Sequence, residues 1–258
     1  MAHRSDGESV LHKHLRVLQA FEIDRPFLTL TEIAEATGLP PTTAHRLVAA
    51  LEREGMLERA PDRTYQLGIR LWEFAARTPG ALGLREIARP WLDEVHARVR
   101  QHTQLGVRSR RDVLFIERMS ARGATVNATV IGGRFPLAVT SSGLVLLAHA
   151  GSAVVDDVVA SGWPALTPKT IRTSDELRAR LRRVRADGYV VADGHIHPAS
   201  RGIAVPVQGE GGRVIAAIGV VVPSDGSSAQ ASIEMLTVAA SGIGRAIREA
   251  HLIRGAGG

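Results

Sequence analysis

The sequence predicts an α+β protein in which a small winged helix-turn-helix precedes a linker helix and a larger antiparallel sheet covered by helices. Three observations lead to this fold class. Short amphipathic helices joined at a glycine open the chain, a strand pair around a Pro-Asp turn follows, and strand-like segments alternate with helices in the remainder. At 258 residues the chain is long enough for two domains.

Composition excludes several classes of protein. Hydrophobic residues make up 45% and charged residues 22% of the chain, so intrinsic disorder is not expected. The absence of cysteine excludes disulfide scaffolds, thiolate zinc sites, iron–sulfur clusters and cysteine nucleophiles. No signal peptide is visible in residues 1–10, and the longest apolar run, 214–222, is too short to span a membrane. We therefore expect a cytoplasmic protein with no membrane partner.

The first helix is expected at residues 9–23. Its apolar stripe comprises Val10, His14, Leu15, Leu18 and Phe21. Thr29 and Glu32 form a capping box that starts a second helix, and Gly38 ends it. A third helix follows at residues 41–54 with proline at its first position, where the missing N–H costs nothing. Two short helices joined by a glycine turn make a helix-turn-helix.

The third helix has two distinct faces. Its apolar face comprises Ala44, Leu47, Val48 and Leu51. The opposite face comprises Thr42, His45, Arg46, Ala49 and Arg53. A helix that enters the major groove needs small side chains for close approach and Arg or Thr to reach bases and phosphates. The residues that we predict to contact duplex DNA from this helix are Thr42, Thr43, His45, Arg46 and Arg53, although a plain amphipathic surface helix has the same pattern.

A β-hairpin is expected next, with strands at 56–59 and 64–68 around a Pro-Asp turn. A helix-turn-helix followed by a hairpin is a winged helix, and the hairpin forms its wing. Arg59, Arg63 and Tyr65 are the candidates for contacts between this wing and the DNA backbone or minor groove. For each of these residues taken singly, an ordinary solvated hairpin remains the alternative.

The Pro/Gly-rich stretch 79–83 is the expected domain boundary. Further helices are expected at 69–78, at 84–102 (with Pro90 in its first turns or at a kink), and at 141–150, 153–161, 174–187 and 229–251. Further strands are expected at 103–108, 113–118, 125–131, 189–192, 203–208 and 214–222. These elements give a DNA-binding domain at 1–78, a linker and connecting helix at 79–102, and a sheet domain at 103–258.

The net charge of +6 favours an anionic partner, but the charge is unevenly placed. Residues 1–78 hold ten Lys or Arg against eleven Asp or Glu, whereas residues 79–258 hold 22 against 15. DNA affinity of the first domain must therefore depend on which side its charges face. The side facing the phosphates is expected to carry Arg46, Arg53, Arg59 and Arg63, with acids such as Glu32, Glu35 and Glu73 turned away.

No motif in the chain indicates catalysis. We find no Gly-x-Ser-x-Gly elbow, P-loop, dinucleotide fingerprint or His-Glu-x-x-His sequence. His195 and His197, beside Asp193, are the nearest approach to a metal or acid–base cluster. Because no third ligand lies at a fixed spacing, exposed loop histidines are the simpler interpretation. We expect no enzyme activity, no metal and no other cofactor.

Several runs in both domains resemble the IclR family of transcriptional regulators. In the first domain they are residues 28–34, 37–40, 43–47, 51–55 and 65–68. In the second domain they are residues 133–137, 140–143, 188–189, Asp193, 201–207 and 212–218. The resemblance covers almost the whole chain, and the motifs occur in the family's order.

The resemblance implies a winged-helix domain, a linker helix and a GAF-like effector-binding domain. It also implies homodimers formed through the head and linker, often paired into tetramers. Such assemblies bind pseudo-palindromic operators upstream of catabolic operons, and a small organic effector changes operator binding or promoter activity. The sequence does not fix whether the protein acts as a repressor or an activator.

By resemblance, an effector carboxylate binds backbone amides at a helix start that here corresponds to Ser141 and Ser142, where a helix N-terminus favours an anion. The candidate effector-binding residues are Ser141, Ser142, Asp193, Gly202, Gly219 and Val221. The departures from the family pattern are Leu144 for a lysine, Gly202 for a polar residue, Gly219 and Val221 for two serines, and Ala192 for an acid. They predict a roomier, less polar pocket for an aromatic or apolar acid rather than a small keto acid. Loss of ligand sensing is the alternative.

A second hypothesis keeps the same fold but changes the function. In it the chain is a small-molecule-binding module or metabolic enzyme whose N-terminal head serves only to dimerise. The exposed face of the third helix distinguishes the two hypotheses, because a head that only dimerises has no reason to present Arg46 among small residues.

Overall fold

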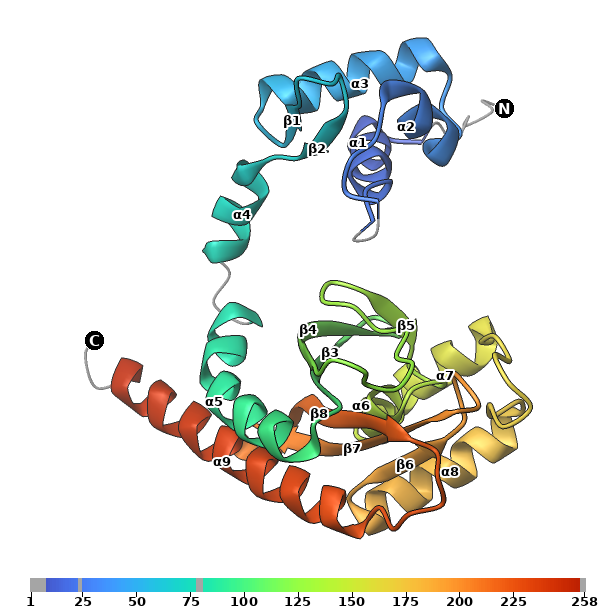
Figure 1. Ribbon diagram of the computed structural model, residues 1–258, viewed down its shortest axis with the longest axis vertical. Helices are drawn as coiled ribbons and strands as arrows, with labels where there is room; N and C mark the ends of the chain where they lie inside the picture. The colour runs from blue at the N-terminus through green and yellow to red at the C-terminus, as the bar shows by residue number, and fades with distance from the viewer. Residues whose placement is uncertain (1–7, 23–24, 78–80, 256–258) are drawn as a thin grey trace, which may run out of the picture. The chain divides into compact units, whose positions relative to one another are not determined.

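The computed structural model describes residues 8–22, 25–77 and 81–255, and the chain divides into two compact units, residues 1–82 and 83–258 (Figure 1). Each unit has a hydrophobic core of its own. Among the described residues, no helix is both long enough and apolar enough to cross a membrane.

The first unit is the predicted winged helix-turn-helix. Its elements are α1 (Val10–Gln19), α2 (Leu30–Thr37), α3 (Pro41–Arg53), β1 (Leu57–Arg59), β2 (Tyr65–Leu67) and α4 (Ile69–Ala76). The capping box of Thr29 and Glu32 starts α2, and Gly38 ends it in the left-handed conformation at φ 63°. Strands β1 and β2 pair antiparallel, with Leu57 opposite Leu67.

Helix α1 differs from its prediction in length and in the face that it buries. It ends at Gln19, and its one buried residue is Val17. Val10 and Leu15 of the predicted stripe are 60% and 45% exposed. Periodicity identifies an apolar face, but it does not show whether the protein's own core or a partner covers that face.

The second unit is a six-stranded antiparallel sheet with helices on both faces (Figure 1). The strands are β3 (His102–Ser109), β4 (Asp112–Ser120), β5 (Arg134–Pro136), β6 (Val190–Asp193), β7 (Ser200–Gln208) and β8 (Val214–Pro223), in the spatial order β5-β4-β3-β8-β7-β6. The helices are α5 (Ala81–Val99), α6 (Ser141–Ala148), α7 (Ser152–Ser161), α8 (Ser174–Asp187), the short 3₁₀ helix η1 (Glu210–Gly212) and α9 (Gln230–Gly255).

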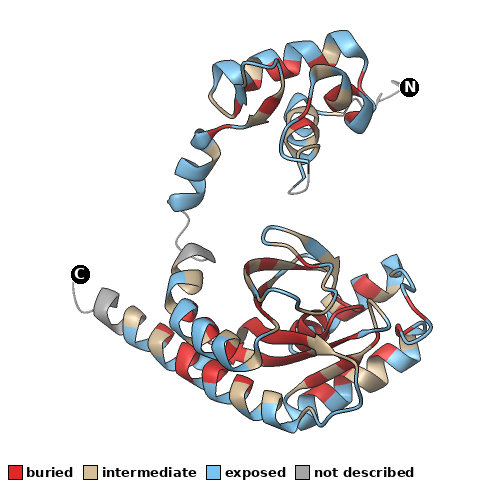
Figure 2. Ribbon diagram, viewed as in Figure 1, coloured by how far each residue is buried: buried red, intermediate tan, exposed pale blue. Residues whose placement is uncertain are grey.

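Two apolar cores lie on opposite faces of this sheet because successive strand residues point to opposite sides. One core packs α6, α7 and α8 against residues such as Phe115 and Ala217. The other packs α5 and α9 against residues such as Leu105 and Ile218. In Figure 2 the buried residues follow the strands and the sides of α5 and α9 that face them. All eight residues of α6 are buried, so this helix is enclosed on every side.

The structure corrects one predicted strand. Residues 125–131 form an irregular segment, and β5, which the sequence analysis missed, pairs with β4 instead. Side chains satisfy the backbone of the segment. Gln101 accepts from the Thr125 N–H at 2.8 Å, and the His102 Nε2 lies 2.6 Å from the Thr125 carbonyl oxygen. Asn127 accepts from the Thr129 N–H at 3.0 Å. At Thr125 and Thr129 these contacts take the place of hydrogen bonds to a neighbouring strand.

Stability should depend on pH through His102. Burial lowers the pKa of its imidazole, and the nearby charges of Arg118 and His96 act in the same direction, whereas the hydrogen bond to Thr125 opposes them. The folded state thus binds fewer protons than the unfolded state just below the ordinary pKa of about 6.5. We expect the free energy of unfolding to fall as pH drops from about 7 to about 5, by at most about 1.4 kcal/mol per pH unit for this group.

Urea unfolding of wild type and the His102→Gln variant over this pH range measures the effect. The variant should show a shallower pH dependence, while His45→Gln, at an exposed position of the first unit with no ion pair among the described residues, should keep the wild-type slope. Identical slopes in wild type and His102→Gln would contradict the prediction.

Candidate functional site

The exposed face of α3 follows directly after the turn at Gly38. The predicted apolar face is confirmed, because Ala44, Leu47, Val48 and Leu51 are all buried. On the opposite face Thr42, His45, Arg46 and Arg53 are exposed, and Thr43 is half-buried. Arg46 and Arg53 form no hydrogen bond or ion pair within the described part of the chain. The face therefore presents unpaired cations among small side chains.

The wing offers one predicted contact residue to solvent and buries another. Arg63 is exposed in the hairpin turn at φ 67°. Tyr65 is only 6% exposed, and its backbone exchanges two hydrogen bonds with Leu28, at 2.7 and 3.0 Å. The guanidinium of Arg59 lies 5.7 Å from the centre of the Tyr65 ring. Strand alternation turns the Tyr65 side chain into the core of the unit, which leaves it little surface for the predicted contact with DNA.

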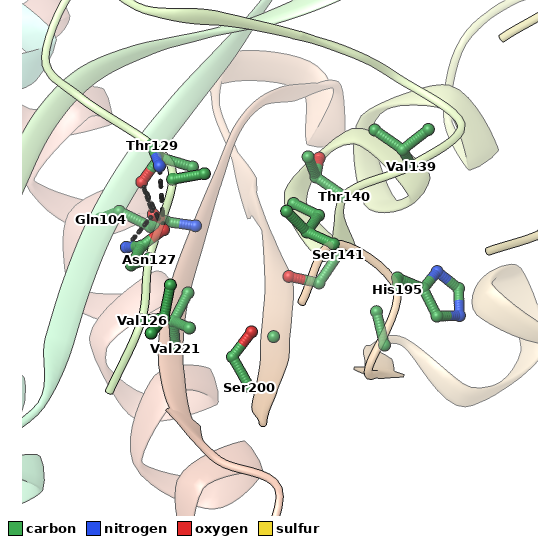
Figure 3. Close-up of a pocket in the computed structure, with 14 residues that line it drawn as sticks. Gln104, Val126, Asn127, Thr129, Val139, Thr140, Ser141, His195, Ser200 and Val221 are labelled. Carbon is green, nitrogen blue, oxygen red and sulfur yellow. Dashed lines mark hydrogen bonds between the residues drawn. The ribbon is translucent and has the colours of Figure 1, made fainter. Parts of the chain in front are cut away.

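The second unit contains a cavity between the start of α6, the sheet and segment 125–131 (Figure 3). The residues that line it are Gln104, Val126, Asn127, Ala128, Thr129, Val139, Thr140, Ser141, Ala192, His195, Ile196, Ser200, Gly202 and Val221. Its volume is about 30 Å³, far below the range for small-molecule sites, so a ring-sized ligand enters only if the residues that line it move apart.

The start of α6 supplies free backbone donors to this cavity. The Thr140 hydroxyl caps the helix by accepting from the Gly143 N–H at 2.8 Å. The N–H groups of Ser141 and Ser142 have no partner in the described part of the chain, as expected at the first two positions of a helix. Unpaired amides and the helix dipole together favour an anion at this point.

Three of the six predicted effector-binding residues, Ser141, Gly202 and Val221, line the cavity. Ser142 lies beneath the lining, where its buried hydroxyl oxygen has no hydrogen-bond partner. Gly219 lies beside it, since a Cβ on Gly219 would be 3.3 Å from that oxygen.

Asp193 is not among the lining residues, because strand alternation places Ala192 in the cavity wall. The Asp193 carboxylate accepts from the Ser224 hydroxyl at 2.5 Å and from Arg201 at 3.4 Å. Both contacts lower its pKa, Ser224 having the larger effect. The carboxylate therefore has a structural role in this fold.

Sequence reasoning missed the polar wall that Gln104, Asn127 and Thr129 form. Gln104 lies within a correctly predicted strand, and its alternation could have placed it on this face. Asn127 and Thr129 were assigned to a strand that does not form, which concealed them. Because of these residues, the cavity is more polar than we expected from the departures from the family pattern.

The histidine cluster is arranged differently from a metal site. The His195 ring lies at the edge of the cavity, directed away from its centre (Figure 3). Burial lowers the pKa of this imidazole, and the charge of Arg180 adds to the effect. Among the residues that the structure describes, no group of three or more His, Asp or Glu side chains is placed to hold a metal ion.

Comparison with known proteins extends across both units. The family profile described as "Bacterial transcriptional regulator IclR C-terminal" matches residues 78–245, and the "IclR helix-turn-helix domain" profile matches residues 10–61. The HTH-type transcriptional regulator XynR of Escherichia coli is 30% identical over 210 residues, which cover 81% of this chain and 83% of XynR. The p-hydroxybenzoate hydroxylase transcriptional activator of Acinetobacter baylyi is 28% identical over 214 residues, covering 81% and 79% of the two chains.

Solved structures agree with these matches. An IclR homolog from Microbacterium hydrocarbonoxydans, crystallised in complex with 4-hydroxybenzoate, is 41% identical, and the alignment covers 93% of this chain and 100% of that one with a TM-score of 0.88. A putative transcriptional regulator from Rhodococcus is 27% identical at a TM-score of 0.77, over 93% and 98% of the two chains. The protein therefore belongs to the IclR family and is a DNA-binding transcriptional regulator rather than an enzyme.

Proposed function

We propose that this regulator binds a pseudo-palindromic operator through α3 as a homodimer or a tetramer, and that a monocyclic aromatic acid in the cavity changes that binding. The observation that carries the proposal is the cavity itself, with unpaired amides of α6 at one side and apolar walls around it. The regulated genes would encode the breakdown of that acid, and the protein would act in the cytoplasm, where its operator lies.

Arg46 is the residue of α3 best suited to read DNA. It is exposed, unpaired in the described part of the chain, and flanked by small side chains, so that nothing hinders its approach to a base edge. Because residues 1–78 hold more acidic than basic side chains, general attraction by this part of the chain is weak. The DNA affinity of this part of the chain must come from a few cations that face the duplex. Among these, Arg53 and Arg63 contact the DNA backbone.

We expect Arg46→Ala to weaken operator binding by roughly 1–3 kcal/mol, as for the loss of one bidentate base contact. Fluorescence anisotropy with the DNA upstream of the protein's own gene measures this. The control is Arg182→Ala, which removes an exposed arginine from α8 of the other unit. Equal affinity of wild type and Arg46→Ala across a salt series would show that α3 does not read the operator.

The chemical groups that line the cavity suit an aromatic acid. The amides of Ser141 and Ser142 suit a carboxylate, and Val126, Val139, Ile196 and Val221 offer apolar contact to a ring. Two relatives support this assignment: the Microbacterium homolog was crystallised with 4-hydroxybenzoate, and the Acinetobacter relative is named as the activator of p-hydroxybenzoate hydroxylase.

The Ser141→Pro variant tests the carboxylate site. Proline at the first position of a helix is tolerated, and Thr140 already has the extended backbone that a following proline requires. The variant thus removes one N–H without breaking a hydrogen bond of the described chain. We expect calorimetry to show an affinity for 4-hydroxybenzoate at least about tenfold lower, equal to about 1.4 kcal/mol.

Ser141→Ala, which keeps the amide, is the control for this experiment and should bind close to wild type. Titration of wild type with aliphatic keto acids completes the panel. If wild type binds small keto acids but binds no aromatic acid, the proposed effector class is wrong.

The homodimer is proposed from exposed apolar side chains in the first unit. On α1, Val10 and Leu11 are 60% and 69% exposed, and on α4, Ile69 and Trp72 are each 65% exposed. Such apolar surface on one small unit is typical of an interaction site. Pairing two copies through it would place two α3 helices on one operator.

We expect Leu11→Glu and Trp72→Glu each to shift the protein toward monomer, because each places a charge in the dimer contact. Analytical ultracentrifugation measures the change in mass. Leu166→Glu, at a 43% exposed position of the second unit, should leave the assembly unchanged. Retention of the wild-type mass by both α1 and α4 variants would place the dimer contact elsewhere.

A further inference from the structure

Gln104 lies at the centre of the cavity wall that the sequence analysis missed. It is in β3, opposite Arg118 of β4 and Gly219 of β8, and it is only 2% exposed. Gly219 has no side chain to cover it. The amide of Gln104 therefore faces the cavity, and the direction in which that amide is turned decides what the cavity can bind.

The neighbouring hydrogen bonds fix that direction. The Thr129 N–H donates to Asn127 Oδ1 at 3.0 Å, and a backbone N–H can only donate, so this atom of Asn127 must be the oxygen. Asn127 Nδ2 then donates to Gln104 Oε1 at 3.4 Å. The Thr129 hydroxyl lies 2.7 Å from the same Gln104 oxygen and 2.9 Å from Asn127 Oδ1, and its single proton serves either acceptor. The Asn127 amide is therefore the group that requires the oxygen of Gln104 to face segment 125–131, and the Thr129 hydroxyl is compatible with this orientation.

The nitrogen of Gln104 is consequently turned toward the interior of the cavity. Figure 3 shows it on the side away from Asn127 and Thr129, both of which are joined to the oxygen by dashed lines. Within the described part of the chain this Nε2 has no hydrogen-bond partner. Because this nitrogen is open to the cavity, a ligand that carries an acceptor takes the place of water as its partner.

The two polar sides of the cavity each present N–H donors, and the hydroxyls of Ser141 and Ser200, which donate or accept, also line it. Ser141, at the start of α6, lies at one side and Gln104 at the other, and the apolar side chains of Val126 and Val221 lie next to Gln104 (Figure 3). A matching ligand has an acceptor at each end and an apolar middle. For a monocyclic acid, the carboxylate supplies the first acceptor and a ring oxygen remote from it supplies the second.

We propose that Gln104 determines ligand specificity by donating a hydrogen bond from Nε2 to an oxygen on the far side of the ring from the carboxylate. This inference rests on the proposed function, since it assumes that an aromatic acid occupies the cavity. It adds that Asn127 and Thr129 are positioning residues, because they act on the ligand through the orientation of the Gln104 amide.

Isothermal titration of the full chain with three probes tests the assignment. Benzoate has no second polar group, 4-hydroxybenzoate has an oxygen that can accept, and 4-aminobenzoate has a nitrogen that donates but accepts poorly. Wild type should bind 4-hydroxybenzoate about tenfold more tightly than either other probe, the value of one well-placed hydrogen bond. Gln104→Met, similar in size without the donor, should bind all three with about the affinity of wild type for benzoate.

The matched control is Gln208→Met, which makes the same change at the exposed end of β7. It should retain the wild-type preference for 4-hydroxybenzoate. If wild type binds none of the probes, the proposed effector class fails. If benzoate and 4-hydroxybenzoate bind equally well to wild type, or Gln104→Met keeps the preference, the effector class stands and the role of Gln104 is overturned.

Asn127→Asp provides a second test that leaves Gln104 in place. Its carboxylate has no donor to offer the Gln104 oxygen, so the Gln104 amide must rotate to donate to it, which turns Oε1 into the cavity. The added negative charge should weaken the binding of all three probes. The ratio of the affinities for 4-hydroxybenzoate and 4-aminobenzoate should invert, so that 4-aminobenzoate is now bound more tightly. An unchanged ratio would overturn the proposed orientation of Gln104 even if Gln104→Met fails to fold.

Discussion

The close approach of α6 to the sheet is the constraint on which the rest of the second unit depends. Every residue of α6 is buried, so its backbone must fit between the preceding loop and β7. A Cβ on Gly143 would lie 2.3 Å from the Leu137 carbonyl oxygen, and one on Gly202 would lie 2.7 Å from the Ser141 hydroxyl oxygen. Both contacts are too short for another residue to be placed there without a shift. Only with glycine at these points does the N-terminus of the helix reach the cavity with its first amides free.

Strand β3 joins this cavity to the helix that precedes it. Gln104 forms part of the cavity wall, and three residues earlier in the chain Gln101 accepts from the Thr125 N–H, where segment 125–131 begins. Helix α5 ends at Val99, directly before β3. It is also held from the neighbouring strand, because the buried carboxylate of Glu117 accepts from Arg85 at 2.8 Å. Segment 125–131 is thus attached to the same short piece of backbone that follows α5.

Elements with capping residues at their ends were predicted well, whereas elements whose structure depends on what packs against them were not. Helix α8 matches its predicted bounds because Thr173 caps its start and Gly188 ends it in the left-handed conformation. Segment 125–131 has the apolar and β-branched composition of a strand, yet the Thr125 backbone pairs with the side chains of Gln101 and His102, which are distant in sequence. The burial of Tyr65 and the place of Gln104 in the cavity wall were missed for a similar reason, because the side of a strand that becomes core or cavity depends on what packs against it. Local sequence cannot supply that information.

The glycines that replace polar residues of the family pattern do not make the cavity larger. On Gly219 a Cβ would lie 2.8 Å from the Ile203 carbonyl oxygen, and on Gly202 it would meet Ser141, so the missing side chains allow tighter packing rather than leave room. Polar recognition on β7 and β8 is reduced as a result, and the polar wall of the cavity is instead supplied by β3 and segment 125–131. In the proposed binding mode, donors face the cavity from two sides and the ligand is selected by where it carries acceptors. Size alone would not distinguish two aromatic acids that differ by a single oxygen, whereas an amide N–H directed into the cavity would.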